Sequence, residues 1–316
     1  MRKLFLAAAF TAAAGLSGTA FATDYTIMAP AAPGGGWDQT ARAMQSVMQE
    51  TGLSKKVQVV NVPGAGGTIG LAQFVNQSKG NPTALLVGGY VMVGAILTNN
   101  SPVSLADVTP IARLTGESVA IVVPANSPIK TVADLVAKLK ADPGSVSWAG
   151  GSAGGADHIT AGLFAKTVGV DPTKVNYIAF SGGGEALAAI LGGQVTVGIS
   201  GLSEFRSQIE AGKLRLLAVS TDKRVPGVDA PTLREAGVDM ALENWRMVAA
   251  APGITAEQKA AISADIHKMV TSDIWKETLA TRGWVDTYLA GEAFDKQLAT
   301  DIAATSAILK EIGLVK

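Results

Sequence analysis

Short apolar segments alternate along this chain with helix-length amphipathic segments. The apolar segments are rich in Val, Ile, Leu or Ala, and such continuous apolar runs are typical of strands buried on both faces of a sheet. Helical segments between them, such as 38–50, 132–141 and 157–168, favour a largely parallel α/β sheet. The predicted strands are 25–30, 56–61, 84–89, 119–124, 146–149, 175–180, 195–200, 214–220 and 245–251.

The last part of the chain has a different pattern. After Pro252-Gly253 the pattern predicts helices only. Two apolar stripes at helical spacing occur there, and such stripes are typical of core packing. The two stripes are Ile262, Ile266, Met269 and Val270, and Phe294, Leu298 and Ile302.

Prolines and turn-rich stretches indicate two domains. Pro124, Pro128 and the stretch 223–231 are candidate boundaries. They predict a first lobe of residues 23–120 plus 225–316 and a second lobe of residues 121–224, with the second boundary within about 222–245. A chain that leaves a lobe and returns crosses twice, and two crossings make a hinge.

The first 22 residues have the pattern of a cleaved export signal. Arg2 and Lys3 precede an apolar stretch, residues 4–16, and Ala20-Phe21-Ala22 is a small-residue cleavage pattern. We therefore expect cleavage after Ala22 and a mature protein in the periplasm. The chain has no cysteine, so disulfides, thiolate metal sites and a lipidated cysteine anchor are excluded.

The balance of basic and acidic residues further restricts the classes of molecule that the protein is expected to bind. The chain has 26 basic and 26 acidic residues, and loss of Arg2 and Lys3 would leave 24 basic residues against 26 acidic ones. A basic face for nucleic acid is not indicated. Two histidines and no cysteine give no metal-ligand cluster, and we expect no cofactor.

Four glycine-rich segments each follow a predicted strand and open a predicted helix. Helix starts carry unpaired N–H groups and a partial positive charge, and glycine lets an anion approach the backbone closely. None of the four contains a nucleotide-binding signature, so we predict that together they hold a carboxylate. The segments are 33–38, 63–68, 150–155 and 181–184.

Other interpretations of these segments stay open. Glycines at strand–helix junctions can serve tight turns alone. Residues 150–154 also match the G-x-S-x-G pattern of serine hydrolases, with Ser152 as nucleophile. A triad would need a histidine, and the candidates are His158 and the late His267.

Polar and aromatic residues beside the loops have two interpretations each. His158 is either a ligand-facing donor or a packed histidine, and Asp38 and Asp157 are expected to be N-caps. Trp37 and Tyr90 could line a cavity or only pack. Arg246 could pair with a second ligand carboxylate, but a surface salt bridge is the expected role.

Six segments in their order and spacing resemble the substrate-binding proteins of tripartite tricarboxylate transporters, the TctC/Bug-like family. The resemblance covers nearly the whole mature chain. The segments are 33–38, 61–67, 151–158, 181–184, 211–219 and 231–237.

The resemblance implies a type II periplasmic binding protein fold, with two α/β lobes joined by two crossing strands and a ligand cleft between them. It implies a carboxylate held largely by backbone groups and ordered water, delivered to a permease of one large and one small membrane subunit. Segments 88–92 and 200–204 depart from the pattern of the family. The resemblance therefore does not predict how the far end of the ligand is bound. The predicted ligand contacts are Gly35, Gly36, Trp37, Asp38, Gly66, Gly67, Tyr90, Ser152, His158, Ser181, Gly183 and Ser203.

We therefore expect a monomeric, non-enzymatic solute-binding protein for a small organic carboxylate, with citrate or another tri- or dicarboxylate as the first choice. An exported sensor for a signalling partner would use the same cleft, and a purely structural exported protein would have no ligand cleft.

Overall fold

The computed structural model describes residues 24–316. The predicted export signal, residues 1–22, and its cleavage point lie outside the described residues.

The strands of the described residues form one continuous ten-stranded sheet. Its order is β2-β1-β3-β9-β4-β7-β5-β6, and β8 and β10 also pair with β4. The strands are β1 Tyr25–Ala29, β2 Val57–Asn61, β3 Ala84–Gly89, β4 Thr109–Pro124, β5 Ser147–Gly150, β6 Asn176–Ala179, β7 Val197–Gly201, β8 Leu214–Val219, β9 Glu243–Ala250 and β10 Val285–Ala290.

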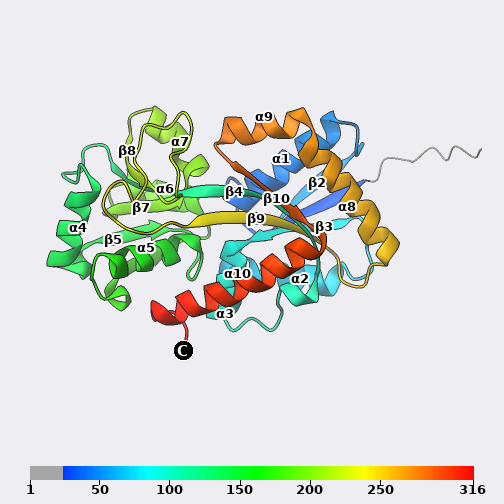
Figure 1. Ribbon diagram of the computed structural model, residues 1–316, viewed down its shortest axis with the longest axis horizontal. Helices are drawn as coiled ribbons and strands as arrows, with labels where there is room; N and C mark the ends of the chain where they lie inside the picture. The colour runs from blue at the N-terminus through cyan, green and yellow to red at the C-terminus, as the bar shows by residue number, and fades with distance from the viewer. Residues whose placement is uncertain (1–23) are drawn as a thin grey trace, which may run out of the picture.

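One long strand, β4, is shared by both halves of the molecule. Residues 109–118 of β4 pair with β9, whereas residues 119–124 pair with β7 and β8. We call the half that contains β1–β3, β9 and β10 the first lobe, and the half that contains β5–β8 the second lobe. Figure 1 shows β4 and β9 running through the middle of the molecule, with the two lobes on either side.

The sheet is parallel only in part, which corrects the prediction of a largely parallel sheet. The pairs β1–β2, β1–β3, β5–β6 and β5–β7 are parallel. The pairs that involve β4 or β9 are antiparallel. The reason is topological, because the chain passes from one lobe to the other along β4 and runs in the opposite direction along β9.

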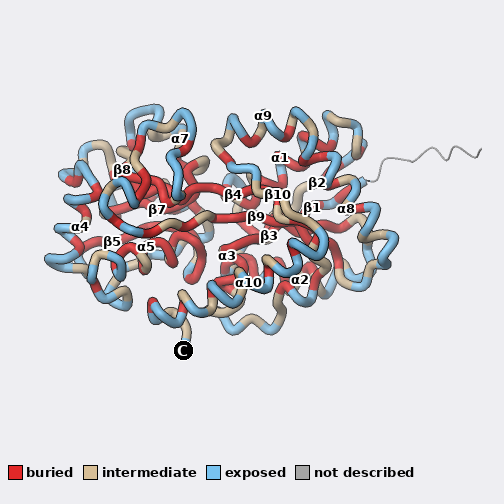
Figure 2. Tube along the Cα trace, in the orientation of Figure 1, coloured by how far each residue is buried: buried red, intermediate tan, exposed pale blue. Residues whose placement is uncertain are grey.

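Helices cover both lobes, and most of the strands between them are buried, as the apolar runs predict (Figure 2). The outer strands β2 and β6 are instead largely half-buried or exposed. Both predicted stripes in the last part of the chain are core, with Ile302 only partly buried. The helices are α1 Gly36–Glu50, α2 Thr68–Gln77, α3 Tyr90–Thr98, α4 Val132–Ala141, α5 Ala156–Thr167, α6 Gly183–Leu191, α7 Leu202–Glu210, α8 Ala256–Thr271, α9 Asp273–Arg282 and α10 Gly291–Glu311.

Strand β10 corrects the prediction that only helices follow Pro252-Gly253, because it lies between α9 and α10. The residues of β10 are exposed or only partly buried, so they lack the buried apolar run by which the other strands are recognised. The strand forms because it pairs with β4 from a position far along the chain. The Thr115 hydroxyl of β4 donates a hydrogen bond to the Val285 carbonyl oxygen over 2.7 Å.

The C-terminal helix α10 contacts both lobes. Phe294 and Leu298, near its start, are buried in the core, and the helix runs along the lower side of the molecule in Figure 1. At its far end Ile312 packs against Gly162 of α5, and Glu311 pairs with Lys166. The helix therefore adds a second connection between the lobes besides the strands.

Candidate functional site

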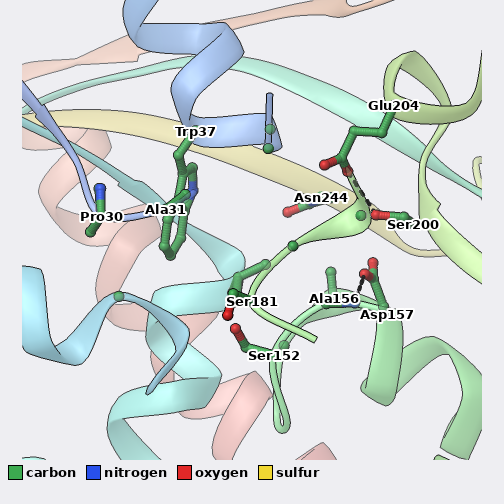
Figure 3. Close-up of a pocket in the computed structure, with 18 of the residues that line it drawn as sticks. Pro30, Ala31, Trp37, Ser152, Ala156, Asp157, Ser181, Ser200, Glu204 and Asn244 are labelled. Carbon is green, nitrogen blue, oxygen red and sulfur yellow. Dashed lines mark hydrogen bonds between the residues drawn. The ribbon is translucent and has the colours of Figure 1, made fainter. Parts of the chain in front are cut away.

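All four predicted glycine loops line one cavity between the lobes. The cavity has a volume of about 60 Å³, which is room for roughly four to six water-sized groups. Figure 3 shows Trp37 on one side of the cavity and Glu204 with Ser200 on the other. The glycines in its lining are Gly35, Gly36, Gly64, Gly67, Gly151, Gly155, Gly182 and Gly183.

Each loop ends at a helix whose N-terminus has no side-chain cap. The N-cap residues of α1, α2, α5 and α6 are Gly35, Gly67, Gly155 and Gly182, and no side chain within residues 24–316 accepts a hydrogen bond at these caps. Helices α4, α8 and α9, which lie away from the cavity, are capped by threonine or serine, whereas α3, α7 and α10 also begin without a side-chain cap. The N–H groups at the starts of α1, α2, α5 and α6 are therefore available to an acceptor in the cavity.

At these loops glycine is required for two reasons: neighbouring atoms leave no room for a Cβ, and some of the residues have a positive φ. A Cβ on Gly36 would overlap the Arg246 guanidinium, and a Cβ on Gly183 would lie 2.5 Å from Ser200 Oγ. Gly67 has a φ of 89° and faces the Trp37 ring, a conformation that other residues adopt at a cost. The loops thus bring peptide groups, without side chains, to the cavity wall.

A buried ion pair lies beside the cavity. Arg246 of β9, which is 1% exposed, pairs with Glu117 of β4, which is 0% exposed. Arg246 Nη1 also donates to Thr40 Oγ1 over 3.2 Å, and the guanidinium lies 5.0 Å from the centroid of the Trp284 ring. The expectation of a surface salt bridge for Arg246 is wrong, because β9 is a central strand and its partner Glu117 lies on the adjacent strand.

Two further carboxyl groups face the cavity from the second lobe. Burial, and next the nearby Glu204 carboxylate, raise the pKa of Asp157 against the opposing effect of hydrogen bonds from Gly151 N–H and the Ser200 hydroxyl, and the resulting pKa is about 7. Burial, and next the Glu117 charge, also raise the pKa of Glu204. Both groups accept hydrogen bonds, from Gly151 N–H to Asp157 over 2.7 Å and from the Ser200 hydroxyl to Glu204 over 2.7 Å.

The raised pKa of Asp157 predicts that stability depends on pH. The folded protein retains a proton on Asp157 up to a pKa of about 7, whereas the unfolded chain loses it near 3.8. The free energy of unfolding therefore falls as the pH rises from about 4 to about 7 and then levels off. Asp157→Asn should reduce this fall by up to about 4 kcal/mol, measured by urea unfolding at several pH values.

Asp295→Asn is the matched control for this experiment. Asp295 is exposed on α10, so its substitution should leave the pH dependence unchanged. A pH dependence in Asp157→Asn that equals that of the unsubstituted protein would show that Asp157 does not titrate in this range.

The structure brings seven of the predicted ligand contacts together at the cavity and places five outside its lining. Those in the lining are Gly35, Gly36, Trp37, Gly67, Ser152, Ser181 and Gly183. Those outside it are Asp38, Gly66, Tyr90, His158 and Ser203, although Gly66 lines a neighbouring hollow together with Ser152 and Ser181. The ligand contacts themselves stay predictions.

Three of the predicted residues outside the lining contact other residues of the protein near the cavity. Tyr90 is buried, and its ring packs edge-to-face against Trp245. Asp38 accepts a hydrogen bond from Gly34 N–H over 2.8 Å and pairs with Arg42. Ser203 donates its backbone N–H to Glu117 over 2.7 Å.

Neither aspartate is an N-cap, which corrects that expectation. Helix α1 begins at Gly36 and α5 at Ala156, so Asp38 and Asp157 already lie inside the first turn. Each bonds instead to an amide of its own glycine loop, Gly34 or Gly151. The carboxylates therefore fix the loops and leave the helix starts uncapped.

His158 takes the packed position of the two that the sequence allowed. Its ring stacks on Tyr177 with centroids 4.1 Å apart, and its Nδ1 accepts a hydrogen bond from Gly154 N–H over 3.2 Å. Burial lowers the pKa of His158 to about 4, so the ring is neutral at pH 7. The other histidine, His267, lies beside Tyr288 in the first lobe.

The sequence interpretation missed Glu204, Ser200 and Asn244, which also line the cavity. Ser200 and Glu204 are four residues apart across the end of β7 and the first turn of α7. A polar pair at a strand–helix junction was the available signal, but the segment lacks the glycine run of the other four loops.

The described residues contain no group of three His, Asp or Glu side chains that could hold a metal ion. No helix within residues 24–316 is long and apolar enough to cross a membrane.

Comparison with known proteins gives one family and a consistent fold. Residues 40–314 match the family model described as "Tripartite tricarboxylate transporter family receptor". The protein BugT of Bordetella pertussis is 26% identical over 322 aligned residues, which cover 99% of this chain and 98% of BugT.

Two solved structures show the same fold. The periplasmic binding protein BugD has a TM-score of 0.84 at 23% identity, covering 93% of this chain and 98% of BugD. MatC from Rhodopseudomonas palustris, with bound malate, has a TM-score of 0.79 at 23% identity, covering 92% of this chain and 100% of MatC. The predicted α/β periplasmic binding protein fold is thereby confirmed.

Proposed function

This chain belongs to the tripartite tricarboxylate transporter family receptors, and we propose on that premise that it captures a small organic carboxylate in the periplasm and delivers it to a membrane transporter. The family is one of receptors rather than of enzymes.

One observation carries the proposal: four uncapped helix starts, two from each lobe, converge on one cavity. Each such start offers N–H donors and a partial positive charge to an anion. Because the donors come from both lobes, an anion between them links the lobes and favours their contact.

The expected hydrogen-bond energies are sufficient for ligand binding. A hydrogen bond to an ionised group contributes about 1.5–3 kcal/mol, so roughly six would contribute about 9–18 kcal/mol. Association and ordering cost about 4–15 kcal/mol. A net value of about 8 kcal/mol, which corresponds to micromolar binding, is within this range.

The sequence and the family support a place of action and a partner for this protein. The export pattern in residues 1–22 supports a periplasmic location, and the family description supports delivery to a tripartite transporter. We propose a permease of one large and one small membrane subunit as the partner, and a monomeric receptor.

Thermal-shift screening tests the proposal. We expect at least one compound in a panel of mono-, di- and tricarboxylates, with citrate and malate among them, to raise the melting temperature, because a ligand that binds the folded state stabilises it. Uncharged amides of the same acids are the controls and should have no effect. Failure of every carboxylate to stabilise the protein would contradict the proposal.

A further inference from the structure

Strand β9, which runs between the lobes, contributes two side chains to the cavity wall, Asn244 and Arg246. They are two positions apart on one strand, so their side chains point to the same face of the sheet. Asn244 lies opposite Glu117 of β4 in the strand pairing. In the view of Figure 3, Asn244 lies between Trp37 on one side and Ser200 on the other.

The Asn244 carboxamide is buried without a hydrogen-bond partner for its oxygen. The residue is 8% exposed, and its Oδ1 is a buried atom that no donor within residues 24–316 contacts. Of the buried side-chain atoms in the described chain that lack a partner, Asn244 Oδ1 alone belongs to a residue of this cavity lining. A buried polar group left unpaired costs free energy, and nearly all such groups in folded proteins are paired. Asn244 is therefore complementary to a ligand that can pair with it.

The remaining buried polar side chains of the lining differ from Asn244 because they already make hydrogen bonds or ion pairs. Their partners within residues 24–316 are Glu117 for Arg246, Glu204 for Ser200, and the Gly151 N–H for Asp157. The hydrogen-bonding capacity of Asn244 is thus the one among these buried side chains that the protein itself does not use.

The chemistry of a carboxamide limits which ligand group it can bind. A carboxamide has a donor end and an acceptor end and carries no charge. A hydroxyl can pair with either end, and a carbonyl oxygen can pair with the donor end. A carboxylate taken out of water also needs a counter-charge, but the neighbouring Arg246 is already paired with Glu117. Asn244 is therefore suited to an uncharged oxygen.

Resting on the proposed function, we infer that Asn244 is a specificity-determining residue, whose carboxamide hydrogen-bonds to an uncharged oxygen of the ligand beyond the carboxylate that the helix starts bind. The helix starts then give affinity for any carboxylate, and Asn244 discriminates between acids of the same shape. An acid that lacks such an oxygen leaves the carboxamide buried and unpaired, which weakens its binding.

Two series of acids that differ at one carbon test this role: propionate, lactate and pyruvate, and glutarate, 2-hydroxyglutarate and 2-oxoglutarate. Calorimetric titration of the full mature chain should show that the hydroxy or oxo member of at least one series binds roughly 3- to 10-fold more tightly than the unsubstituted member, the factor for one hydrogen bond between uncharged groups. A preference for the hydroxy member alone identifies Oδ1 as the contact, and an equal preference for both identifies the carboxamide N–H.

Asn244→Leu keeps the size of the side chain and removes its hydrogen-bonding groups. It should abolish the preference and leave the affinity for the unsubstituted acid equal or higher. The melting temperature without ligand should stay the same or rise, because an unpaired buried polar group is removed, whereas loss of a structural hydrogen bond would lower it. Asn244→Thr keeps a hydroxyl and suits a strand, so it should retain part of the preference and supplies the test if the leucine variant does not fold.

Asn176→Leu is the matched control. Asn176 is exposed on the edge strand β6 and lies outside the cavity lining, so the same chemical change there should alter neither the preference nor the affinity. If both Asn244 variants keep the full preference, or if hydroxy and oxo acids bind no more tightly than unsubstituted ones, the role of Asn244 is overturned and the receptor function stands. If no carboxylate of these series or of the wider panel binds, both are overturned.

Discussion

Glu117→Gln is expected to lower the free energy of unfolding by about 3–5 kcal/mol, the loss typical of a buried ion pair that loses one partner. Glutamine keeps the shape of the side chain and can still accept the Ser203 N–H. It leaves the Arg246 guanidinium, which is 1% exposed, without its buried counter-charge. Urea unfolding measured with and without the substitution gives the difference.

A second ion pair on the same two strands supplies the control. Arg113 of β4 pairs with Glu243 of β9 over 2.7 Å, but the Glu243 side chain is 31% exposed. Arg113 also keeps Asp301, at 3.7 Å. Glu243→Gln should therefore cost about 1 kcal/mol or less, and equal losses for the two substitutions would contradict the role given to burial.

Gly94→Ala is expected to weaken ligand binding by up to about 100-fold without unfolding the protein. Gly94 lies on α3 of the first lobe, and a Cβ there would overlap the carbonyl oxygen of Gly154 in the second lobe. Such overpacking costs about 1–3 kcal/mol, and the lobes can relieve it by moving apart. The apparent affinity then falls with the fraction of molecules whose lobes are in contact.

Two readouts separate this effect from misfolding. Alanine favours the helix by up to about 1 kcal/mol over glycine, so the melting temperature without ligand should be nearly unchanged, while small-angle scattering should show a larger radius of gyration. Gly144→Ala, where a Cβ would make only ordinary contacts, is the control. Unaltered affinity in Gly94→Ala would mean that lobe contact at this point is not needed for binding.

The local features of the fold could be predicted from the sequence. Apolar runs such as 84–89 identify strands because the strands are buried on both faces, and the glycine runs identify the uncapped helix starts. The edge strand β10 escaped prediction because its residues are half exposed and its pairing with β4 depends on a distant segment.

The electrostatics of the site could not be predicted in the same way. Glu117 and Arg246 are separated by 129 positions, and nothing in either local sequence indicates that they meet. Glu204 reaches the cavity because α7 begins at Leu202 directly after β7, which sets its direction. Such placements depend on how strands are ordered in the sheet rather than on a local pattern.

Binding of a carboxylate at the uncapped helix starts is tested most directly by a crystal structure. The crystals should contain the carboxylate that gives the largest thermal shift. The expected result is a carboxylate whose oxygens lie about 2.7–3.2 Å from backbone nitrogens at the starts of α1 and at least one of α5 and α6, with Arg246 still paired to Glu117. A carboxylate held instead by the Arg246 side chain, or bound away from the glycine loops, would contradict it.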